Sequence, residues 1–147
     1  MYPVLIAAAV IALDQIIKNI MTEALASGPI TVIKNFFYLV YVKNYGIAFG
    51  MFKNKVLFFI VTNCIISAFM AFVIYRFHDK NVPVTICLSL ILGGAIGNVI
   101  DRIRLGYVVD YLSFTIFPPV FNLADSAIVV GALMLSLLLI LNKDASI

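Results

Sequence analysis

Long apolar runs dominate the chain, and short polar connectors separate them. A helix needs about 20 mainly apolar residues to cross the hydrocarbon core of a bilayer. Four segments meet this requirement, over residues 3–22, 56–75, 84–102 and 124–141. Backbone groups in lipid must find their hydrogen-bond partners within their own segment, so runs of this kind are helical. The pattern therefore predicts four transmembrane helices.

The connector between the first two helices, residues 29–55, has a different composition. It holds the stretch ITVIKNFFYLVYVKNYGIAFGMF, which is rich in β-branched and aromatic residues and is interrupted at Lys34-Asn35 and again at 44–46. This composition is typical of two or three short strands joined by turns. The connector between the third and fourth helices is aromatic and ends in a proline pair. We expect an all-α membrane protein, a single domain over 1–147, with one small strand-rich connector.

The composition supports a membrane protein and excludes several other classes. Apolar residues make up 64% of the chain and charged residues 12%, whereas an ordinary soluble domain carries roughly 25% charged residues. The net charge is only +3 and the basic residues are scattered, so we expect no nucleic-acid partner. Cys64 and Cys87 lie in apolar runs without paired spacing, and we interpret them as packing residues. We expect neither a cofactor nor a metal site.

Charged and amide side chains inside the apolar segments are unusual, because burying them in lipid is unfavourable. Asp14 and Lys18 are four residues apart on one helix face, which favours an ion pair. Asn98, Asp101 and Arg102 share a face near the end of the third segment. In the same segment, Gly93 and Gly97 are spaced so that another helix can approach closely. Taken alone, these features are typical of helix packing.

The predicted topology brings the polar residues to one side of the membrane. The end of the first helix, the end of the third and the start of the fourth share that side with the strand-rich connector. Asp110 and Asp125 lie on the two arms of the loop between the last two helices. A hairpin can bring the two face to face, and two carboxylates at close range cannot both ionise cheaply, so the pair holds one shared proton. One carboxyl can then accept a proton from water while the other donates to a carbonyl oxygen. A proteolytic dyad is one interpretation; loop caps and proton-pathway carboxylates are the others.

Five stretches of the chain occur together in one known family. They are DQIIK at 14–18, NYGIAFG at 44–50, GGAIGNVIDR at 93–102, GYVVDY at 106–111 and FNLAD at 121–125. In this order, and in these places relative to four helices, they resemble the bacterial lipoprotein signal peptidases (signal peptidase II). The resemblance covers nearly the whole chain. It departs from the family at Tyr111, where phenylalanine is usual.

The resemblance implies an aspartic endopeptidase of the bacterial cytoplasmic membrane. Members cut prolipoproteins just before a cysteine that carries diacylglycerol, so we expect these prolipoproteins and membrane lipids as partners, and a monomeric enzyme. The positions that match the catalytic pair are Asp110 and Asp125. The positions that match substrate-binding or supporting residues are Asp14, Lys18, Asn44, Gly46, Phe49, Asn98, Asp101, Arg102 and Asn122. Among them, Phe49 is expected to close over the site.

Orientation in the membrane is the point on which charge and family disagree. The family places both termini in the cytoplasm and the site near the outer face. A count of basic residues favours the opposite orientation, because cytoplasmic loops are usually enriched in lysine and arginine. The first and third connectors carry Lys34, Lys43, Lys53, Lys55, Arg102 and Arg104, and the other side carries Arg76, Lys80 and Lys143. We adopt the family's orientation, because the charge rule is statistical.

Three other functions are compatible with some of these residues. A small ion or proton transporter could use the carboxylates as a relay, but the chain has no internal repeat and its charges gather at one face. A serine peptidase could use Ser126 or Ser113 with a lysine, although neither serine has an evident base beside it. A carboxylate metal site without histidine would suit only a hard cation.

Overall fold

Four long helices form the body of the protein. The computed structural model describes residues 1–46 and 56–141, and within them the helices are α1 (Tyr2–Ala24), α2 (Val56–Phe77), α3 (Val82–Leu105) and α4 (Leu123–Leu141). Each is long and apolar enough to cross a membrane. The four predicted helices are therefore confirmed. Their ends differ from the expected ones by at most three residues, as at Leu105 against the expected 102.

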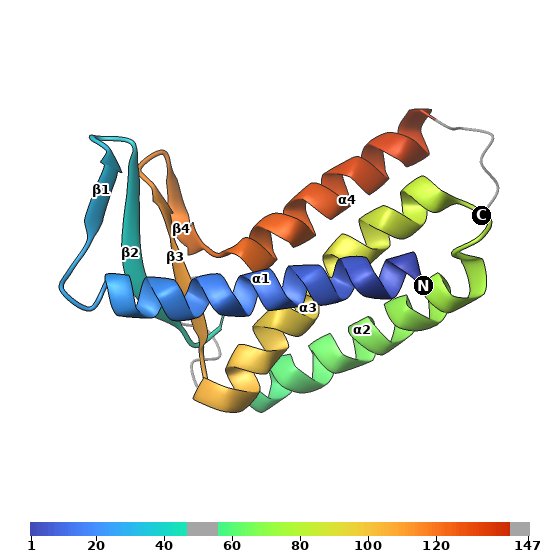
Figure 1. Ribbon diagram of the computed structural model, residues 1–147, viewed down its shortest axis with the longest axis horizontal. Helices are drawn as coiled ribbons and strands as arrows, with labels where there is room; N and C mark the ends of the chain where they lie inside the picture. The colour runs from blue at the N-terminus through green and yellow to red at the C-terminus, as the bar shows by residue number, and fades with distance from the viewer. Residues whose placement is uncertain (47–55, 142–147) are drawn as a thin grey trace.

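The third helix, α3, lies at the centre of the bundle. In its most apolar window 56% of the residues are buried, against 11–17% in the other three helices. The helix begins where the Asn81 side chain accepts a hydrogen bond from Val84 N at 3.2 Å, and it ends at Gly106 with φ of 80°. An N-cap side chain and a left-handed glycine are the usual signals for these two ends. The other helices pack around α3 (Figure 1).

Close packing of α1 on α3 depends on two glycines of α3. A Cβ atom added at Gly93 would lie 2.9 Å from the carbonyl oxygen of Ala7, and one added at Gly97 would lie 2.7 Å from Asp14 Oδ2. Larger residues would push the helices apart at both points. The face predicted from the glycine spacing is confirmed. It brings the polar end of α1 against that of α3.

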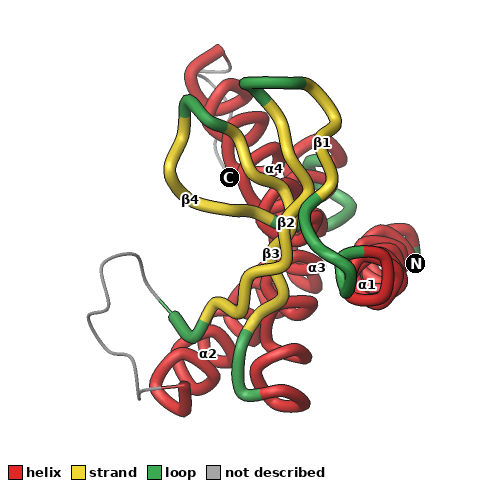
Figure 2. Tube along the Cα trace, turned by 90° about the vertical axis from the view of Figure 1, so that its left-hand side faces the viewer, coloured by secondary structure: helices red, strands yellow, loops and turns green. Residues whose placement is uncertain are grey.

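A four-stranded antiparallel sheet caps one end of the bundle. Its order along the sheet is β1 (Ile30–Ile33), β2 (Phe37–Asn44), β3 (Val108–Phe114) and β4 (Phe117–Phe121). Viewed from that end, the strands lie in front of the helix ends (Figure 2). The N-terminus and the end of α4 lie at the opposite end of the molecule (Figure 1).

The sheet corrects the expectation of an essentially all-α protein with strands in the first connector alone. The first connector supplies β1 and β2, but the second connector adds β3 and β4. Pairing of β2 with β3 joins the two, with Val42 opposite Asp110. The proline pair, Pro118 and Pro119, lies in the edge strand β4, where the register with β3 shifts and neither proline has a paired residue opposite it. Prolines in strands are confined to edges and irregular positions of this kind.

Candidate active site

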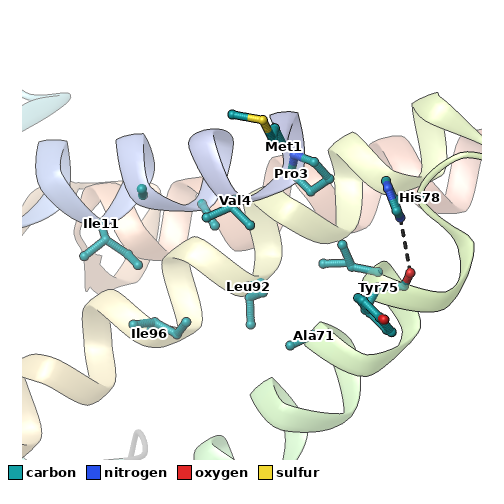
Figure 3. Close-up of a pocket in the computed structure, with 12 residues that line it drawn as sticks. Met1, Pro3, Val4, Ile11, Ala71, Tyr75, His78, Leu92 and Ile96 are labelled. Carbon is teal, nitrogen blue, oxygen red and sulfur yellow. Dashed lines mark hydrogen bonds between the residues drawn. The ribbon is translucent and has the colours of Figure 1, made fainter.

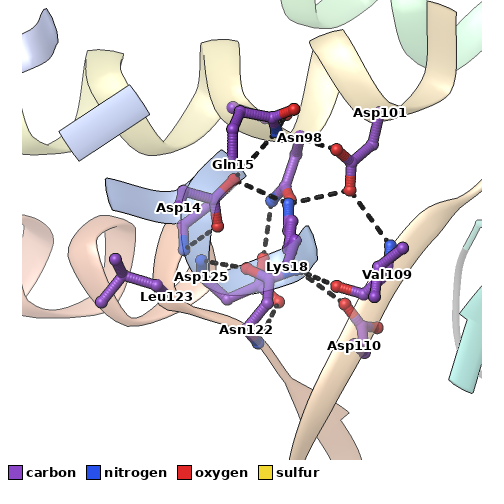
Figure 4. Close-up of polar contacts among 12 residues, drawn as sticks. Asp14, Gln15, Lys18, Asn98, Asp101, Val109, Asp110, Asn122, Leu123 and Asp125 are labelled. Carbon is purple, nitrogen blue, oxygen red and sulfur yellow. Dashed lines mark hydrogen bonds and ion pairs between the residues drawn. The ribbon is translucent and has the colours of Figure 1, made fainter. Parts of the chain in front are cut away.

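Polar side chains from α1, α3, α4, β3 and the β4–α4 junction meet where the bundle joins the sheet (Figure 4). The members at this junction that are at most 7% exposed are Asp14, Lys18, Asn98, Asp101, Asp110 and Asn122. The expectation that the intramembrane charges gather at one end is confirmed for the described residues. Burial of so many polar groups is tolerated because they are hydrogen-bonded to one another.

Lys18 holds two carboxylates together. Its Nζ lies 2.8 Å from Asp14 Oδ2, as the helical spacing predicted, and 2.9 Å from Asp101 Oδ2 on α3. The same nitrogen donates to Asn98 Oδ1 at 3.0 Å. The other oxygen of each acid also accepts a hydrogen bond. Asp14 Oδ1 accepts from Ala124 N at 3.0 Å, and Asp101 Oδ1 accepts from the side-chain amide of Gln15 on α1. This cluster ties α1, α3 and the start of α4 to one another.

Asn122 and Asp125 fix the start of α4 by reciprocal hydrogen bonds. The Asp125 backbone N–H donates to Asn122 Oδ1 at 2.8 Å, and the Asn122 backbone N–H donates to Asp125 Oδ2 at 3.3 Å. This is a capping box, with the acid three residues after the cap. The remaining oxygen, Asp125 Oδ1, accepts from Asn98 Nδ2 at 2.8 Å. The carboxylate of Asp125 is therefore held from two sides.

The side-chain amide of Asn122 stands between the two aspartates. Its Nδ2 donates to Asp110 Oδ1 at 2.7 Å, and also lies 3.2 Å from Asn98 Oδ1 and 3.3 Å from the Val109 carbonyl oxygen. Asp110 and Asp125, both among the described residues, share no direct hydrogen bond. One residue thus caps the helix that carries Asp125 and orients the carboxylate of Asp110.

Asp110 lies in the middle of the sheet and is only 1% exposed. Burial raises the pKa of this carboxyl to about 6; hydrogen bonds from Asn44 and Asn122 oppose the rise, and the charge of Asp125 adds to it. The carboxyl therefore exchanges its proton near neutral pH, which suits a general acid or base.

The end of β2 supplies a further contact to this carboxyl. Asn44 Nδ2 donates to Asp110 Oδ2 at 2.8 Å, while Asn44 Oδ1 accepts from Gly46 N at 3.0 Å. Gly46 has a φ of 122°, a conformation that side-chain-bearing residues rarely adopt. The two predicted residues thus aim an amide at Asp110. Phe49, expected to close over the site, lies outside the described residues.

Arg102 is near the carboxylates and makes no hydrogen bond to them within the described part of the chain. Its Nη1 donates to the carbonyl oxygen of Asn98 at 3.4 Å, and its guanidinium carbon lies 5.7 Å from the centre of the Phe59 ring. Its buried Nε has no hydrogen-bond partner among the residues that the structure describes. Of the residues predicted from sequence, Arg102 is therefore the one least engaged in the network.

Two residues to which sequence reasoning gave no role help to build the site. Gln15 Nε2 donates to Asp101 Oδ1 at 2.8 Å, and its Oε1 accepts from Arg104 at 3.2 Å. Tyr111, the departure from the family pattern, accepts from Leu123 N at 3.1 Å through its hydroxyl. That N–H belongs to the first turn of α4 and has no partner within the helix. An amide beside Asp14 in an apolar helix was the available signal for Gln15.

One apolar cavity of the described structure lies away from the carboxylates. This α1–α2 cavity, of about 520 Å³, lies between the first half of α1, the end of α2 and α3 (Figure 3). Its lining is almost wholly apolar, with residues such as Val4, Ile11 and Leu92. The polar network lies at the other end of α1. This cavity is therefore separate from the candidate active site.

Comparison with known proteins gives a consistent result. Residues 6–141 match the family model described as signal peptidase (SPase) II. The chain is 48% identical over 138 residues to a lipoprotein signal peptidase of Caldanaerobacter subterraneus subsp. tengcongensis, covering 93% of this chain and 94% of that protein. It is 47% identical over 131 residues to the lipoprotein signal peptidase of Halothermothrix orenii, covering 88% and 89%. A bacterial membrane enzyme solved at 1.9 Å by the in meso method superposes with a TM-score of 0.81 at 32% identity, covering 98% of this chain and 94% of that one.

Proposed function

This chain belongs to the signal peptidase II family, and from that membership we propose that Asp110 and Asp125 form its catalytic dyad. It is a multi-pass bacterial membrane protease of the aspartic type that removes signal peptides from prolipoproteins. We place the cut immediately before the diacylglyceryl-modified cysteine. The observation that carries the dyad is the pair of contacts made by the Asn122 side chain. Its Nδ2 donates to Asp110 Oδ1 at 2.7 Å, and its Oδ1 caps the helix that carries Asp125.

The chemistry needs one proton on the pair. The ionised carboxylate takes a proton from water as the water oxygen bonds to the scissile carbonyl carbon, and the protonated carboxyl donates its proton to the carbonyl oxygen. The resulting tetrahedral diol collapses when the C–N bond breaks, the leaving nitrogen takes a proton from one carboxyl, and a hydroxyl proton returns to the other. The pair ends with one proton, as it began.

The remaining network serves this pair by holding it in place. Asn98 donates to Asp125, and Lys18 fixes Asn98 from behind through its oxygen. Asn44 donates to Asp110 from β2. Arg102, whose buried Nε has no partner within residues 1–46 and 56–141, is proposed to bind substrate. In this account the supporting residues orient the carboxyls and leave the proton on the pair free to move.

We further propose that both termini are cytoplasmic, that the site lies near the outer face, and that the chain acts as a monomer of one domain. Several basic residues that favour the opposite orientation make contacts within the protein. Arg104 donates to Gln15, and Lys43 Nζ lies 5.2 Å from the centre of the Tyr107 ring. Side chains engaged in this way are weaker guides to orientation than free loop charges.

The alternative serine mechanism receives no support from the contacts. Ser126 Oγ donates to the carbonyl oxygen of Asn122 at 2.9 Å, and Lys18, the buried lysine, is engaged by two carboxylates. A cleavage assay on a diacylglyceryl-modified prolipoprotein in detergent tests the proposal. Activity should withstand serine-reactive reagents, a chelator and the change Ser126→Ala. Loss of activity in a folded Ser126→Ala variant would contradict it.

A further inference from the structure

Two apolar grooves run along α4 from the level of Asp125. The first, the β4 groove, has a volume of about 380 Å³ and lies between β4 and α4. Its lining residues are Phe117, Phe121, Asp125, Ser126, Val129 and Val130. Val129 and Val130 are 48% and 49% exposed, so the rest of the protein does not fill this space.

The second groove, the α1 groove, adjoins the first on the surface of α4. It has a volume of about 270 Å³ and is bounded by α1, α3 and α4, through residues that include Val10, Leu13 and Leu90. Ser126 and Val130 line both grooves. These two residues are one helical turn apart on α4, so the two grooves adjoin along this face of the helix.

We propose that the two acyl chains of the substrate's diacylglyceryl group lie in these grooves, one in the β4 groove and one in the α1 groove. The inference rests on the proposed function. The lipid is attached to the side chain of the cysteine next to the scissile bond, so both chains begin a few bonds from the carbonyl that the dyad attacks. Asp125 lines the β4 groove, so that groove begins at the proposed catalytic carboxylate.

The walls of the two grooves are apolar and suit a hydrocarbon chain. Apart from Asp125, the polar side chain in the grooves is that of Ser126, and its hydroxyl already donates to Asn122. A wall without free hydrogen-bonding groups gives water or a polar head group nothing to bind, whereas a methylene chain loses nothing there. The grooves thus select for a lipidated cysteine by position, because they align the cysteine with the dyad.

The larger α1–α2 cavity is a worse candidate for the acyl chains. Its α1 lining ends at Ile11 and its α2 lining lies between Ala71 and His78 (Figure 3). Asp125 starts α4 at the opposite end of the bundle (Figure 1). A chain tethered at the scissile bond reaches the two α4 grooves first.

A groove-filling variant with a matched control tests the inference. Val129→Trp fills the β4 groove, and Leu137→Trp places the same ring on a lipid-exposed position of α4 beyond both grooves. Each is assayed on prolipoprotein peptides that carry either two hexadecanoyl or two hexanoyl chains. Because misplacing a substrate by a small distance can reduce the rate greatly, Val129→Trp should lower kcat/KM about tenfold for the long chains and less than about threefold for the short ones. Leu137→Trp should match wild type on both substrates.

Crosslinking gives an answer that does not depend on the variant's folding. A substrate with a diazirine near the middle of one acyl chain is irradiated with wild-type protein, and the modified peptides are identified by mass spectrometry. Labels between Phe117 and Val130, or at Val10 and Leu13, are expected. Labels confined to the α1–α2 cavity, or an equal loss on both chain lengths for Val129→Trp, would overturn the inference.

The two proposals fail in different ways. If Asp125→Asn abolishes cleavage but chain length and groove filling have no effect, the grooves are wrong and the dyad stands. If Asp125→Asn still cleaves, the dyad is wrong, and the crosslinked positions alone decide whether the acyl chains lie along α4.

Discussion

Lys18 Nζ lies 2.9 Å from Asp101 Oδ2, which makes the ion pair of α1 a three-residue cluster that includes α3. The i, i+4 spacing alone indicated a pair with Asp14, and that contact is present at 2.8 Å. The contact with Asp101 joins residues far apart in the sequence. It means that one ammonium group is the ion-pair partner of two buried carboxylates, so removing it has a larger effect than the pair alone would suggest.

Lys18→Met should therefore destabilise the fold strongly. Leaving a buried charge without its partner costs roughly 3–5 kcal/mol, and here Asp14 and Asp101 both lose theirs. The double change Asp14→Asn with Lys18→Met still leaves Asp101 unpaired, so it should recover only part of the stability. Adding Asp101→Asn should recover most of it. Thermal unfolding in detergent micelles measures all three. Full recovery in the double variant would show that Asp101 does not depend on Lys18.

Asn122→Ser and Asn122→Ala should separate helix capping from orientation of Asp110. Serine can still accept from the Asp125 N–H, so it should be more stable than alanine by about 1 kcal/mol. Both variants lose the amide that donates to Asp110 Oδ1. Hydrogen bonds to charged groups contribute about 1.5–3 kcal/mol, so cleavage should fall by about 10- to 100-fold in each. If the alanine variant lost more activity than the serine variant, in line with its lower stability, Asn122 would act only as a helix cap.

The pH dependence of cleavage should follow the pair's shared proton. Burial raises the pKa of Asp110 to about 6, so raising the pH through that value removes the proton that the mechanism needs. We expect kcat/KM, which reports the free enzyme, to fall by about tenfold per pH unit above about pH 6. A profile that stays flat between pH 5.5 and 8 would contradict the one-proton state.

The same shift sets the sign of the effect of pH on stability. The folded-state pKa of Asp110 lies above its ordinary value of 3.8, so the folded state binds this proton more tightly than the unfolded state. Its contribution to stability is present below about pH 4 and is lost as the pH rises to about 6. The melting temperature of wild type relative to Asp110→Asn should therefore fall across this range. A rise would contradict the assignment.

Orientation can be read from single cysteines placed at each end of the bundle. In a variant without the native cysteines, Lys34→Cys in the first connector should react with an impermeant reagent added to intact cells. Asp79→Cys, at a position with 86% side-chain exposure between α2 and α3, should react only after permeabilisation. The reverse pattern would show that the count of basic residues gave the correct orientation.

Sequence patterns predicted the parts of this fold that depend on local chemistry. Apolar run length located the four helices, helical spacing located the Asp14–Lys18 pair, and glycine spacing located the α1–α3 contact. The strands β3 and β4 were not predicted, because β4 contains two prolines, which are unusual in strands, and β3 depends on pairing with β2, which lies far from it in the sequence. The role of Asn122 between the aspartates also escaped prediction, since it depends on β3 and α4 meeting in space.

The most direct test of the dyad is the cleavage rate of Asp110→Asn and Asp125→Asn on a diacylglyceryl-modified prolipoprotein. Each variant should be folded, with a melting temperature measured in the same detergent, and should lose at least about 100-fold in rate, since general acid–base catalysis is worth about 100- to 10,000-fold. The double variant should be no slower than either single one, because the two carboxyls act as a unit. A folded single variant that keeps a tenth of the wild-type rate would contradict the account.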